Sequence, residues 1–263
     1  KIVGALPYCI TKGLLGLPQI VMPQQTHYSG IWIKYPPEQN HIKRLSYEKG
    51  IMDAIILEID KLNIAYFSLH FPYTVTNWLP FLWKGFQQTT RYSYVIEDLS
   101  DLEKVFNQFE NSKRRWIHKA ERTVTVKHDL PTSIFYQLHQ KDLESIGLKI
   151  NYSYDLLDEM VKKAYDKDKG KIIYCEDGNG NICGAHFIIW DSMSAYSLLG
   201  GCDPDFKDRG INEMLYFESI KYASTRTKQF DFEGSVIESY ERSYRSYGGI
   251  QKPYFNIRKT YSP

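Results

Sequence analysis

The chain has 263 residues, 43% hydrophobic and 15% aromatic, so it is long enough to bury a sizeable core in one large or two modest domains. This composition excludes a disordered protein. Lys and Arg (33) nearly balance Asp and Glu (31) for a formal charge of +2, so any contact with nucleic acid must be local.

The first 95 residues are predicted as short strands mixed with one helix. Residues 48–62 carry isoleucines at a spacing of four, which is typical of an amphipathic helix. Residues 65–69 follow as a strand rich in apolar and aromatic side chains. The aromatic segment 78–83 is interpreted as core or interdomain packing. We expect this part of the chain to form a domain of its own.

The remainder of the chain is predicted as helices and strands in a clearer order. The predicted strands are 92–97, 124–127, 172–175, 182–190, 195–201, 230–232 and 254–258. The predicted helices are 99–122, 132–146, 154–164, 212–223 and 238–247. Ser153 is placed to cap the helix that follows it. The strands 172–175, 182–190 and 195–201, the first two joined by the Asn179-Gly180 turn, are predicted to form an antiparallel meander, and the whole order predicts a mixed α/β arrangement.

The cysteines and histidines do not have the spacing of a metal site. The four cysteines are Cys9, Cys175, Cys183 and Cys202, and none are as close together as tetrahedral zinc sites require, so we expect no metal. Cys175 and Cys183 flank the predicted turn, where they either face each other across two strands or remain free buried thiols. His186 alternates with apolar residues in a strand and is interpreted as a structural histidine.

No segment predicts a membrane span. The longest apolar run near the start, residues 14–23, is interrupted by Gly16, Pro18 and Gln19 and is shorter than the roughly 20 residues that a span needs. No charged-then-apolar leader is recognisable. We therefore expect a cytoplasmic protein; the sequence does not indicate its oligomeric state.

Three segments in the carboxyl-terminal part resemble a known superfamily. The first is the basic stretch 112–122, which leads into a strand at Val124. The second is Gly200-Gly201 with the helix 212–223 after it, and the third is 230–234 with 245–249. In this order they resemble the acyl-CoA N-acyltransferase (GNAT) superfamily, specifically its FemABX-like branch, over residues 78–258.

The resemblance implies an α/β (α+β) GNAT fold, with a mixed, mostly antiparallel twisted sheet flanked by helices. Because the branch places two such domains in tandem, it also implies a partial amino-terminal GNAT-like domain at 1–95 and a carboxyl-terminal GNAT domain at 96–263. The implied activity is N-acyl transfer from acyl-CoA or aminoacyl-tRNA onto an amine, including that of a peptidoglycan precursor. Neither donor is a tightly bound cofactor; each is a co-substrate.

GNAT enzymes bind the phosphates of the donor on a glycine-containing loop at the start of a helix, where free N–H groups favour anions. The matching segment is 207–212. Gly210 fits the pattern and Arg209 adds a positive charge, while Lys207 and Asn212 occupy outer positions that hold other residues in the family. These four residues are the predicted phosphate-binding loop. The alternative is a polar surface loop with a turn at Pro204.

The predicted helix 99–122 ends in the strongest local positive charge of the chain. Its basic residues are Lys113, Arg114, Arg115, Lys119 and Arg122, opposed by a single acidic residue. Helical spacing puts Arg115, Lys119 and Arg122 on one face, with Trp116 and Ala120 on an adjacent face that packs inward. The basic face is predicted to bind phosphates of coenzyme A, of tRNA or of a nucleotide-linked wall precursor. The alternative is an ordinary solvated face.

Proton transfer is assigned to the end of the chain. Glu233 is the predicted base, since burial beside a strand would raise its pKa, and Asp231 is structural. Tyr247 is predicted to protonate the leaving group, with Arg245 and Gly234 binding substrate. The alternative makes Glu233 a helix cap and Tyr247 a packing residue. The competing function is a non-catalytic GNAT-like binding module, or a nucleic-acid binder that uses the helix at 113–122.

Overall fold

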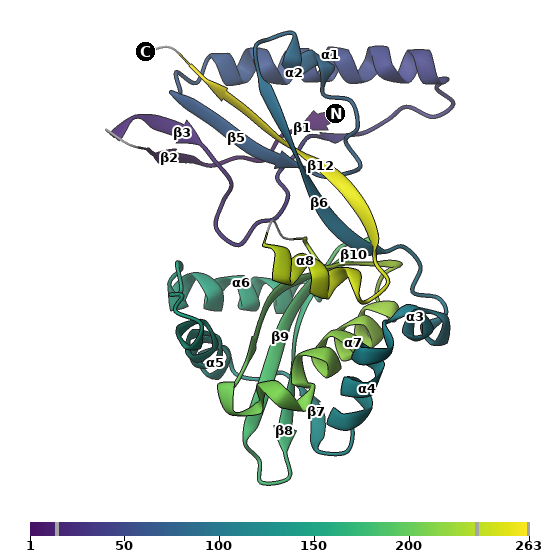
Figure 1. Cartoon of the computed structure of the whole chain (residues 1–263). Helices are drawn as coiled ribbons and strands as arrows, with labels where there is room; N and C mark the ends of the chain where they lie inside the picture. The colour runs from purple at the N-terminus through teal and green to yellow at the C-terminus, as the bar shows by residue number, and fades with distance from the viewer. Residues whose placement is uncertain (14–15, 235–236, 262–263) are drawn as a thin grey trace. The chain divides into compact units, whose positions relative to one another are not determined.

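The computed structural model describes residues 1–13, 16–234 and 237–261. The chain divides into two compact units (Figure 1): residues 1–92 with 252–263, and residues 93–251. The predicted boundary between residues 95 and 96 assigns the last twelve residues to the second domain. In the structure they belong to the first unit, because β12 (Ile250–Thr260) pairs along most of its length with β5 (Tyr66–Phe71).

The first unit contains a small sheet and a long helix. Its strands lie in the order β2 (Ile10–Lys12), β3 (Pro18–Ile20), β5 and β12. β3 and β5 are parallel, and the other neighbours are antiparallel. A separate antiparallel pair joins β1 (Gly4–Ala5) to β4 (Trp32–Ile33), and α2 (Leu79–Leu82) follows β5.

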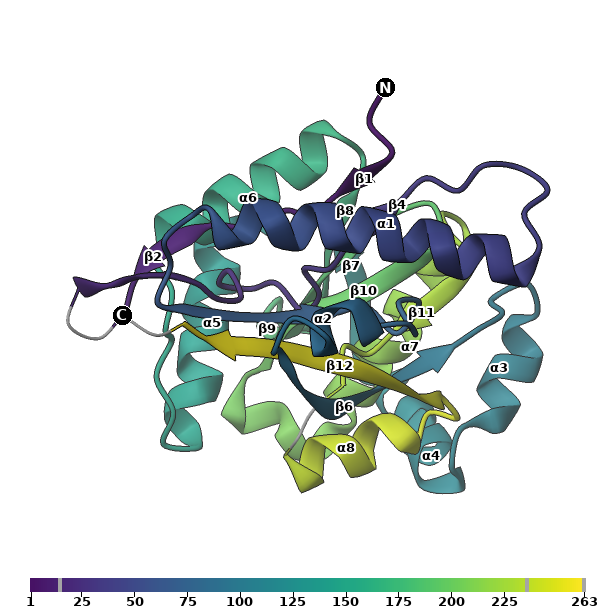
Figure 2. The same ribbon diagram turned by 90° about the horizontal axis from the view of Figure 1, so that it is seen from above.

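Helix α1 (His41–Asp60) runs alongside these strands (Figure 2) and supplies the core of the first unit. Met52, Ile56 and Ile59 are buried against aromatic side chains of β5. The helix begins at His41, before the predicted start at residue 48, because the side-chain oxygen of Asn40 accepts a hydrogen bond from the N–H of Lys43 at 2.9 Å.

The second unit is a mixed sheet with one parallel pair. β6 (Gln87–Ile96) enters it from the first unit, and the strand order is then β11 (Gln229–Asp231), β10 (Ser194–Cys202), β9 (Ile182–Trp190), β8 (Gly170–Asp177) and β7 (Val124–His128). β10 and β11 are parallel, and the other neighbours are antiparallel. The predicted mixed, mostly antiparallel α/β fold is confirmed.

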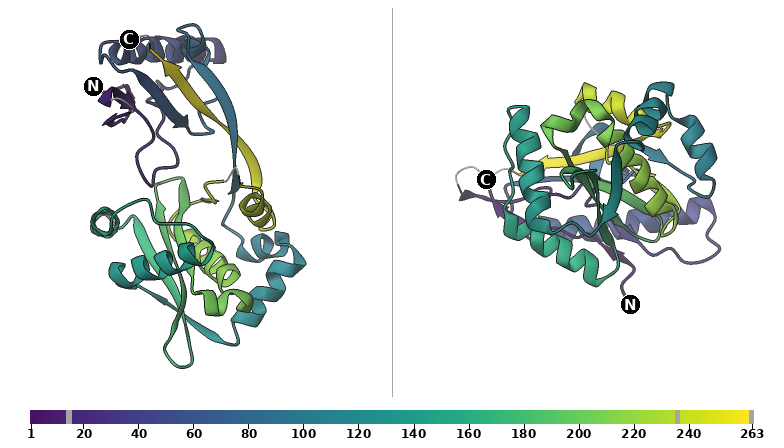
Figure 3. Two further views of the ribbon diagram at one scale, coloured as in Figure 1. Left: turned by 60° about the vertical axis from the view of Figure 1, so that its left-hand side comes forward. Right: turned by 90° about the horizontal axis from the view of Figure 1, so that it is seen from below.

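Helices cover both faces of this sheet (Figures 1 and 3). Successive side chains of a strand point to opposite faces. Ile173 accordingly packs in one core with α3 (Leu102–Gln108), α4 (Asn111–Ala120) and α7 (Ile211–Ser224). Ile172 packs in another with α5 (Thr132–Ser145) and α6 (Tyr154–Asp166). Ser153 caps α6 as predicted, accepting the N–H of Leu156 at 3.2 Å.

The single helix predicted over 99–122 is two helices, α3 and α4. The break falls at Phe109, whose backbone is extended and whose ring is buried against Tyr247 at 5.1 Å between centroids. Glu110 then donates its N–H to the carbonyl of Ser246 at 2.9 Å instead of to a helical partner. Tertiary packing overrides the continuous helical pattern here. Within the described ranges, no helix has the length and apolar character to cross a membrane.

Candidate active site

Strands β10 and β11 run side by side for a short distance and then separate. Their pairing covers residues 194–196 of β10 and 229–231 of β11. β10 continues to Cys202, whereas β11 ends at Asp231. A β-bulge lies between Ser197 and Leu199, directly after the last paired position. Within the described residues, no strand pairs with the edge of β10 that faces β11 beyond Tyr196, and backbone groups at such an edge can bind a ligand.

A hydrogen-bonded turn at the end of β11 places Glu233 beside this gap. The carboxylate of Asp231 is fully buried and accepts hydrogen bonds from the hydroxyl of Ser93 and, at 2.7 Å, from the N–H of Glu233. Glu233 has a positive φ of 62°, a left-handed conformation that is uncommon outside glycine. Asp231 is thus structural, as predicted, and it holds Glu233 out of the strand.

The environment of Glu233 favours its protonated form. Burial raises the pKa of its carboxyl group well above the usual value, and the nearby carboxylate of Asp231 raises it further. A carboxylate with a raised pKa is a better proton acceptor near neutral pH than an exposed one. Burial raises the pKa of the Tyr244 hydroxyl, and the charge of Glu233 adds to this shift.

An aromatic cluster surrounds the turn. The ring of Phe232 stacks on Tyr244 and Tyr247, with centroids 5.5 Å and 5.4 Å away. Tyr216 of α7 contacts the ring of Tyr247 at 5.1 Å. Burial raises the pKa of all three tyrosine hydroxyls, so they remain neutral donors. Among the described residues, the buried hydroxyl of Tyr247 has no hydrogen-bond partner.

Lys113 of α4 brings a positive charge to this cluster. Its ammonium lies 4.8 Å from the centroid of the Tyr247 ring and donates to Glu213 at 3.0 Å and Ser243 at 3.1 Å. The side chain is only 15% exposed. Lys113, Ile117 and Ala120 form the inward face of α4, so the inward residue Trp116 of the sequence prediction is replaced by Ile117.

The predicted basic face is exposed. Arg115 and Lys119 lie on the surface of α4, and Arg122 lies in the turn after it. Lys119 donates to the carbonyl of Asp208 at 2.9 Å and lies over the ring of Trp116. No hydrogen bond or ion pair between described residues joins this face to Glu233. Its role in binding phosphate stays a prediction.

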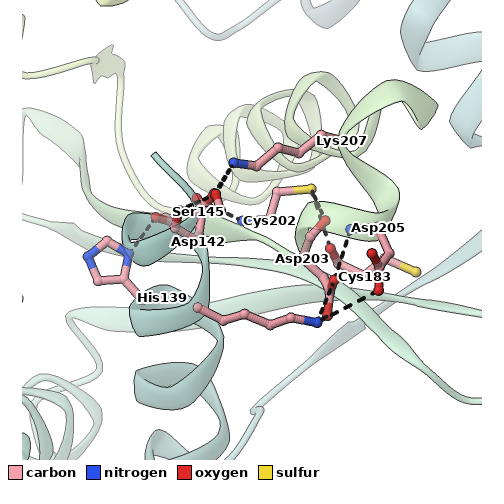
Figure 4. Close-up of polar contacts among 10 residues, drawn as sticks. His139, Asp142, Ser145, Cys183, Cys202, Asp203, Asp205 and Lys207 are labelled. Atoms are coloured by element: carbon pink, nitrogen blue, oxygen red, sulfur yellow. Dashed lines mark hydrogen bonds and ion pairs between the residues drawn. The ribbon is translucent and has the colours of Figure 1, made fainter. Parts of the chain in front are cut away.

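The predicted phosphate loop forms a 3₁₀ segment, η2 (Pro204–Arg209), before α7. Figure 4 shows that the ammonium of Lys207 is already engaged, at 2.8 Å from Asp142 and 2.7 Å from the hydroxyl of Ser145. Arg209 stacks on Phe206, and Asn212 is exposed in the first turn of α7. The phosphate-binding roles of these residues remain predictions.

Gly210 permits close packing at the start of α7. It has φ of 81°, and a Cβ added there would lie 2.4 Å from the carbonyl oxygen of Trp116. Glycine is therefore required for α4 to approach α7, whatever else the loop binds.

Helix α5 fixes the far end of β10 through a polar network (Figure 4). The ring of His139 bonds through Nδ1 to the carbonyl of Gly200 at 2.7 Å, and Asp142 accepts the N–H of Cys202 at 3.1 Å. Lys141 forms an ion pair with Asp203 at 2.7 Å. These contacts hold the β10 side of the gap in place.

Arg245 and Gly234 are predicted to bind substrate. Arg245 is the last residue of α8 (Glu238–Arg245), and Gly234 directly follows Glu233. The guanidinium of Arg245 is exposed and lies 3.5 Å from the carboxylate of Glu241. Gly234 has φ of 65° and continues the turn at Glu233. Their contact with substrate stays a prediction.

Sequence reasoning missed two residues that the structure brings to the cluster. Lys113 was counted only in the basic run, although its spacing of four to Ile117 placed it on the inward face of α4. Tyr216 was included in a helix without being singled out. Its hydroxyl group hydrogen-bonds with Tyr244 and with Ser197 at the bulge of β10. Nothing in the sequence of α7 distinguishes Tyr216 from the other tyrosine of the helix, Tyr222.

The cysteines and the buried histidine have structural surroundings. All four cysteines are free, and three are buried; Cys175 pairs in register with Gly184 instead of facing Cys183. Burial raises the pKa of Cys183 to about 11. His186 lies with Nδ1 3.5 Å from the hydroxyl of Ser219. In the described part of the chain, no group of three or more His, Cys, Asp or Glu could hold a metal ion.

The burial of His186 predicts loss of stability in acid. Desolvation lowers its pKa from 6.5 to about 3, so the folded protein keeps it neutral. Because the pKa is depressed, the neutral histidine contributes stability that is fully present above pH 6.5 and is lost as the pH falls toward 3. At pH 5 the loss from this group is about 2 kcal/mol relative to neutral pH. Urea unfolding of the wild type and of His186→Gln between pH 7.5 and 5 measures this loss. If the unfolding free energy falls equally with pH in both proteins, the assignment to His186 is wrong.

Solved structures of low sequence identity share this fold. FemX has a TM-score of 0.67 and 10% identity, with 94% of this chain and 88% of that chain covered. L-PGS from Bacillus licheniformis has a TM-score of 0.63 and 11% identity, covering 99% and 82%. A tandem GNAT protein from the clavulanic acid biosynthesis pathway has a TM-score of 0.54 and 8% identity, covering 99% and 80%. The chain thus has the fold of tandem GNAT-like domains.

The sequence itself matches one family over more than half of its length. No curated protein matches the chain. Residues 84–242 match the acetyltransferase (GNAT) domain family, a range that includes β10, β11 and Glu233. The chain therefore belongs to the acetyltransferase (GNAT) domain family.

Proposed function

We propose that this protein is an N-acyltransferase that moves an acyl or aminoacyl group from an activated donor onto an amine at the gap between β10 and β11. The observation that carries the proposal is the separation of these parallel strands beside Glu233. Beyond Tyr196, the edge of β10 that pairs with no strand among the described residues offers backbone donors, and Glu233 offers a proton acceptor. An acyl transfer between an activated ester and an amine requires both.

The reaction assigns one task to each group. The amine nitrogen attacks the donor carbonyl, and Glu233 accepts the proton that the nitrogen loses as the new C–N bond forms. The oxyanion accepts hydrogen bonds from backbone N–H groups at the bulge between Ser197 and Leu199. When the C–S or C–O bond to the leaving group breaks, the hydroxyl of Tyr247 supplies a proton. Its lack of a partner among described residues supports this role.

Membership of the GNAT family supports a coenzyme A thioester as donor, and the likeness to the FemABX-like branch keeps aminoacyl-tRNA as the alternative. Thermal unfolding with each donor distinguishes them. A specific donor at a hundred times its dissociation constant adds about 2.7 kcal/mol to the unfolding free energy. If acetyl-CoA and aminoacyl-tRNA both leave unfolding unchanged, the non-catalytic binding module replaces the enzyme. We propose a small-molecule or cell-wall-precursor amine as acceptor.

The basic face of α4 is the candidate site for the phosphates of the donor. Of this face, Arg115 also lines a shallow depression of about 640 Å³, together with Arg114, His118, Asn107 and Asn111, whereas Lys119 and Arg122 lie outside its lining. Arg114 donates to the amide oxygens of Asn107 and Asn111, and the exposed guanidinium of Arg115 can bind phosphate oxygens. The same surface supports the second candidate function, binding of a nucleic acid without catalysis.

Replacing Arg115 and Lys119 by alanine is expected to weaken donor binding and to flatten its salt dependence. Each lost phosphate contact lowers the slope of log K against log salt by about one, so two contacts lower it by about two. Binding is measured by titration at several salt concentrations. The control replaces Lys162 and Lys163 of α6, which removes the same charge from another helix. If the two double variants give the same slope, the basic face does not bind phosphate.

A further inference from the structure

The first unit contains a pocket that the acyl-transfer site does not use. It has a volume of about 210 Å³ and is lined by β4, by one face of α1 and by the segment 74–77. Polar and apolar side chains divide its wall. The polar ones are Thr74, Thr76, Tyr35, Arg44, Glu48 and Asn77, and the last four form one connected hydrogen-bond network.

Glu48 is the centre of that network. It is buried, with 7% of its surface exposed, although it carries a carboxylate. One oxygen accepts the hydroxyl of Tyr35 at 2.8 Å and Nε of Arg44 at 3.2 Å, and the other accepts the amide of Asn77 at 3.2 Å. Three donors therefore satisfy the carboxylate, and its role is to orient the groups around it.

Arg44 is the group that remains available to a ligand. Its guanidinium carbon lies 4.1 Å from the centroid of the Tyr35 ring, and this contact helps to orient the guanidinium group. The side chain is 52% exposed at the pocket. A guanidinium has five N–H donors, and Glu48 and Tyr35 engage only part of them. The remaining N–H groups match the two oxygens of a carboxylate.

The opposite wall suits an apolar body. Met52 is buried at the base, with Ile31 and Val75 beside it. Trp32 is one of the residues that line the pocket, and 52% of its surface is exposed. A large aromatic side chain exposed next to an oriented guanidinium offers a flat contact surface to a ligand.

We infer that this pocket binds a small molecule that carries a carboxylate on an apolar or aromatic body. Arg44 holds the carboxylate bidentately, Glu48 and Tyr35 orient Arg44, and Trp32 covers the apolar part. The inference stands on the first unit alone and does not depend on acyl transfer. Because the Arg44–Glu48 pair is close to neutral, a monoanion fits this site better than a dianion.

Titration of the full-length protein with benzoate, followed by the indole N–H signal of Trp32 in NMR, tests the inference. Comparison with Trp32→Phe identifies that signal. Benzoate is expected to shift it saturably, and its uncharged isostere benzamide to bind at least about tenfold more weakly. Phenyl phosphate is expected to bind more weakly than benzoate. Absence of a saturable shift with benzoate, or tighter binding of phenyl phosphate, overturns the inference.

Two variants of Arg44 separate a built site from charge attraction. Arg44→Gln is expected to weaken benzoate binding at least about tenfold, and Arg44→Lys, which keeps the charge without the planar fork, to weaken it as well. Lys43→Gln, the matched change at the exposed neighbouring position, is expected to bind like the wild type. Benzoate binding that is equal in the wild type and Arg44→Gln refutes the site, as does equal binding by Arg44→Lys.

Discussion

Glu233→Gln is expected to lower turnover by at least about 100-fold while donor binding is preserved, because a glutamine of the same shape cannot accept the proton of the attacking amine. The measurement is steady-state transfer to an amine, with the donor that stabilises the protein in thermal unfolding. The acid limb of the wild-type pH profile reports ionisation of this carboxyl group, whose pKa is raised by burial. That limb is expected to disappear in the variant.

Stability provides the control for this variant. The folded pKa of Glu233 is raised above its unfolded value, so its contribution to stability is present below the unfolded pKa and is lost as pH rises through the folded pKa. At neutral pH the melting temperature of Glu233→Gln is thus expected to equal or exceed that of the wild type, because glutamine carries no charge. A variant that is folded and still turns over at the wild-type rate removes Glu233 from the mechanism.

Gly210→Ala is expected to destabilise the second unit by about 3 kcal/mol or more. Two costs combine at this position. Alanine at a φ of 81° costs about 1–2 kcal/mol, and its Cβ would lie 2.4 Å from the carbonyl oxygen of Trp116, so the backbones of α4 and α7 must move apart. Chemical unfolding of wild type and variant at the same pH measures the loss.

Two other glycines separate these costs. Gly147 has φ of 76° with nothing within 4 Å of an added Cβ, so its alanine variant carries the conformational cost alone. Gly178 has neither a positive φ nor a close neighbour, and alanine there is expected to be close to neutral. If Gly210→Ala loses no more stability than Gly147→Ala, the contact between α4 and α7 is looser than described.

Local patterns predicted the elements on which the site is built. The Asn179-Gly180 turn and the alternating side chains around it correctly indicated the antiparallel strands β8 and β9. Ser153 correctly marked the start of α6, and the aromatic residues at 230 and 232 correctly indicated β11 within one residue. These features depend on neighbours within a few residues, which sequence periodicity records.

The contacts that shape the site depend on residues far apart in the chain. Lys207 lies close to Asp142, and Lys113 close to Glu213, and neither pair has a signal in sequence spacing. The helix break at Phe109 follows from a ring contact with Tyr247. The local helical pattern of residues 99–122 is continuous, so only the packed structure explains why it divides.

A crystal structure of the protein with bound acetyl-CoA tests the central claim most directly. The account predicts that the thioester lies in the gap beyond Tyr196 and Asp231, with its carbonyl oxygen within hydrogen-bonding distance of backbone N–H groups of β10 and with Glu233 facing the reacting carbon. A thioester bound on another surface, with the edge of β10 left in contact with water, contradicts it.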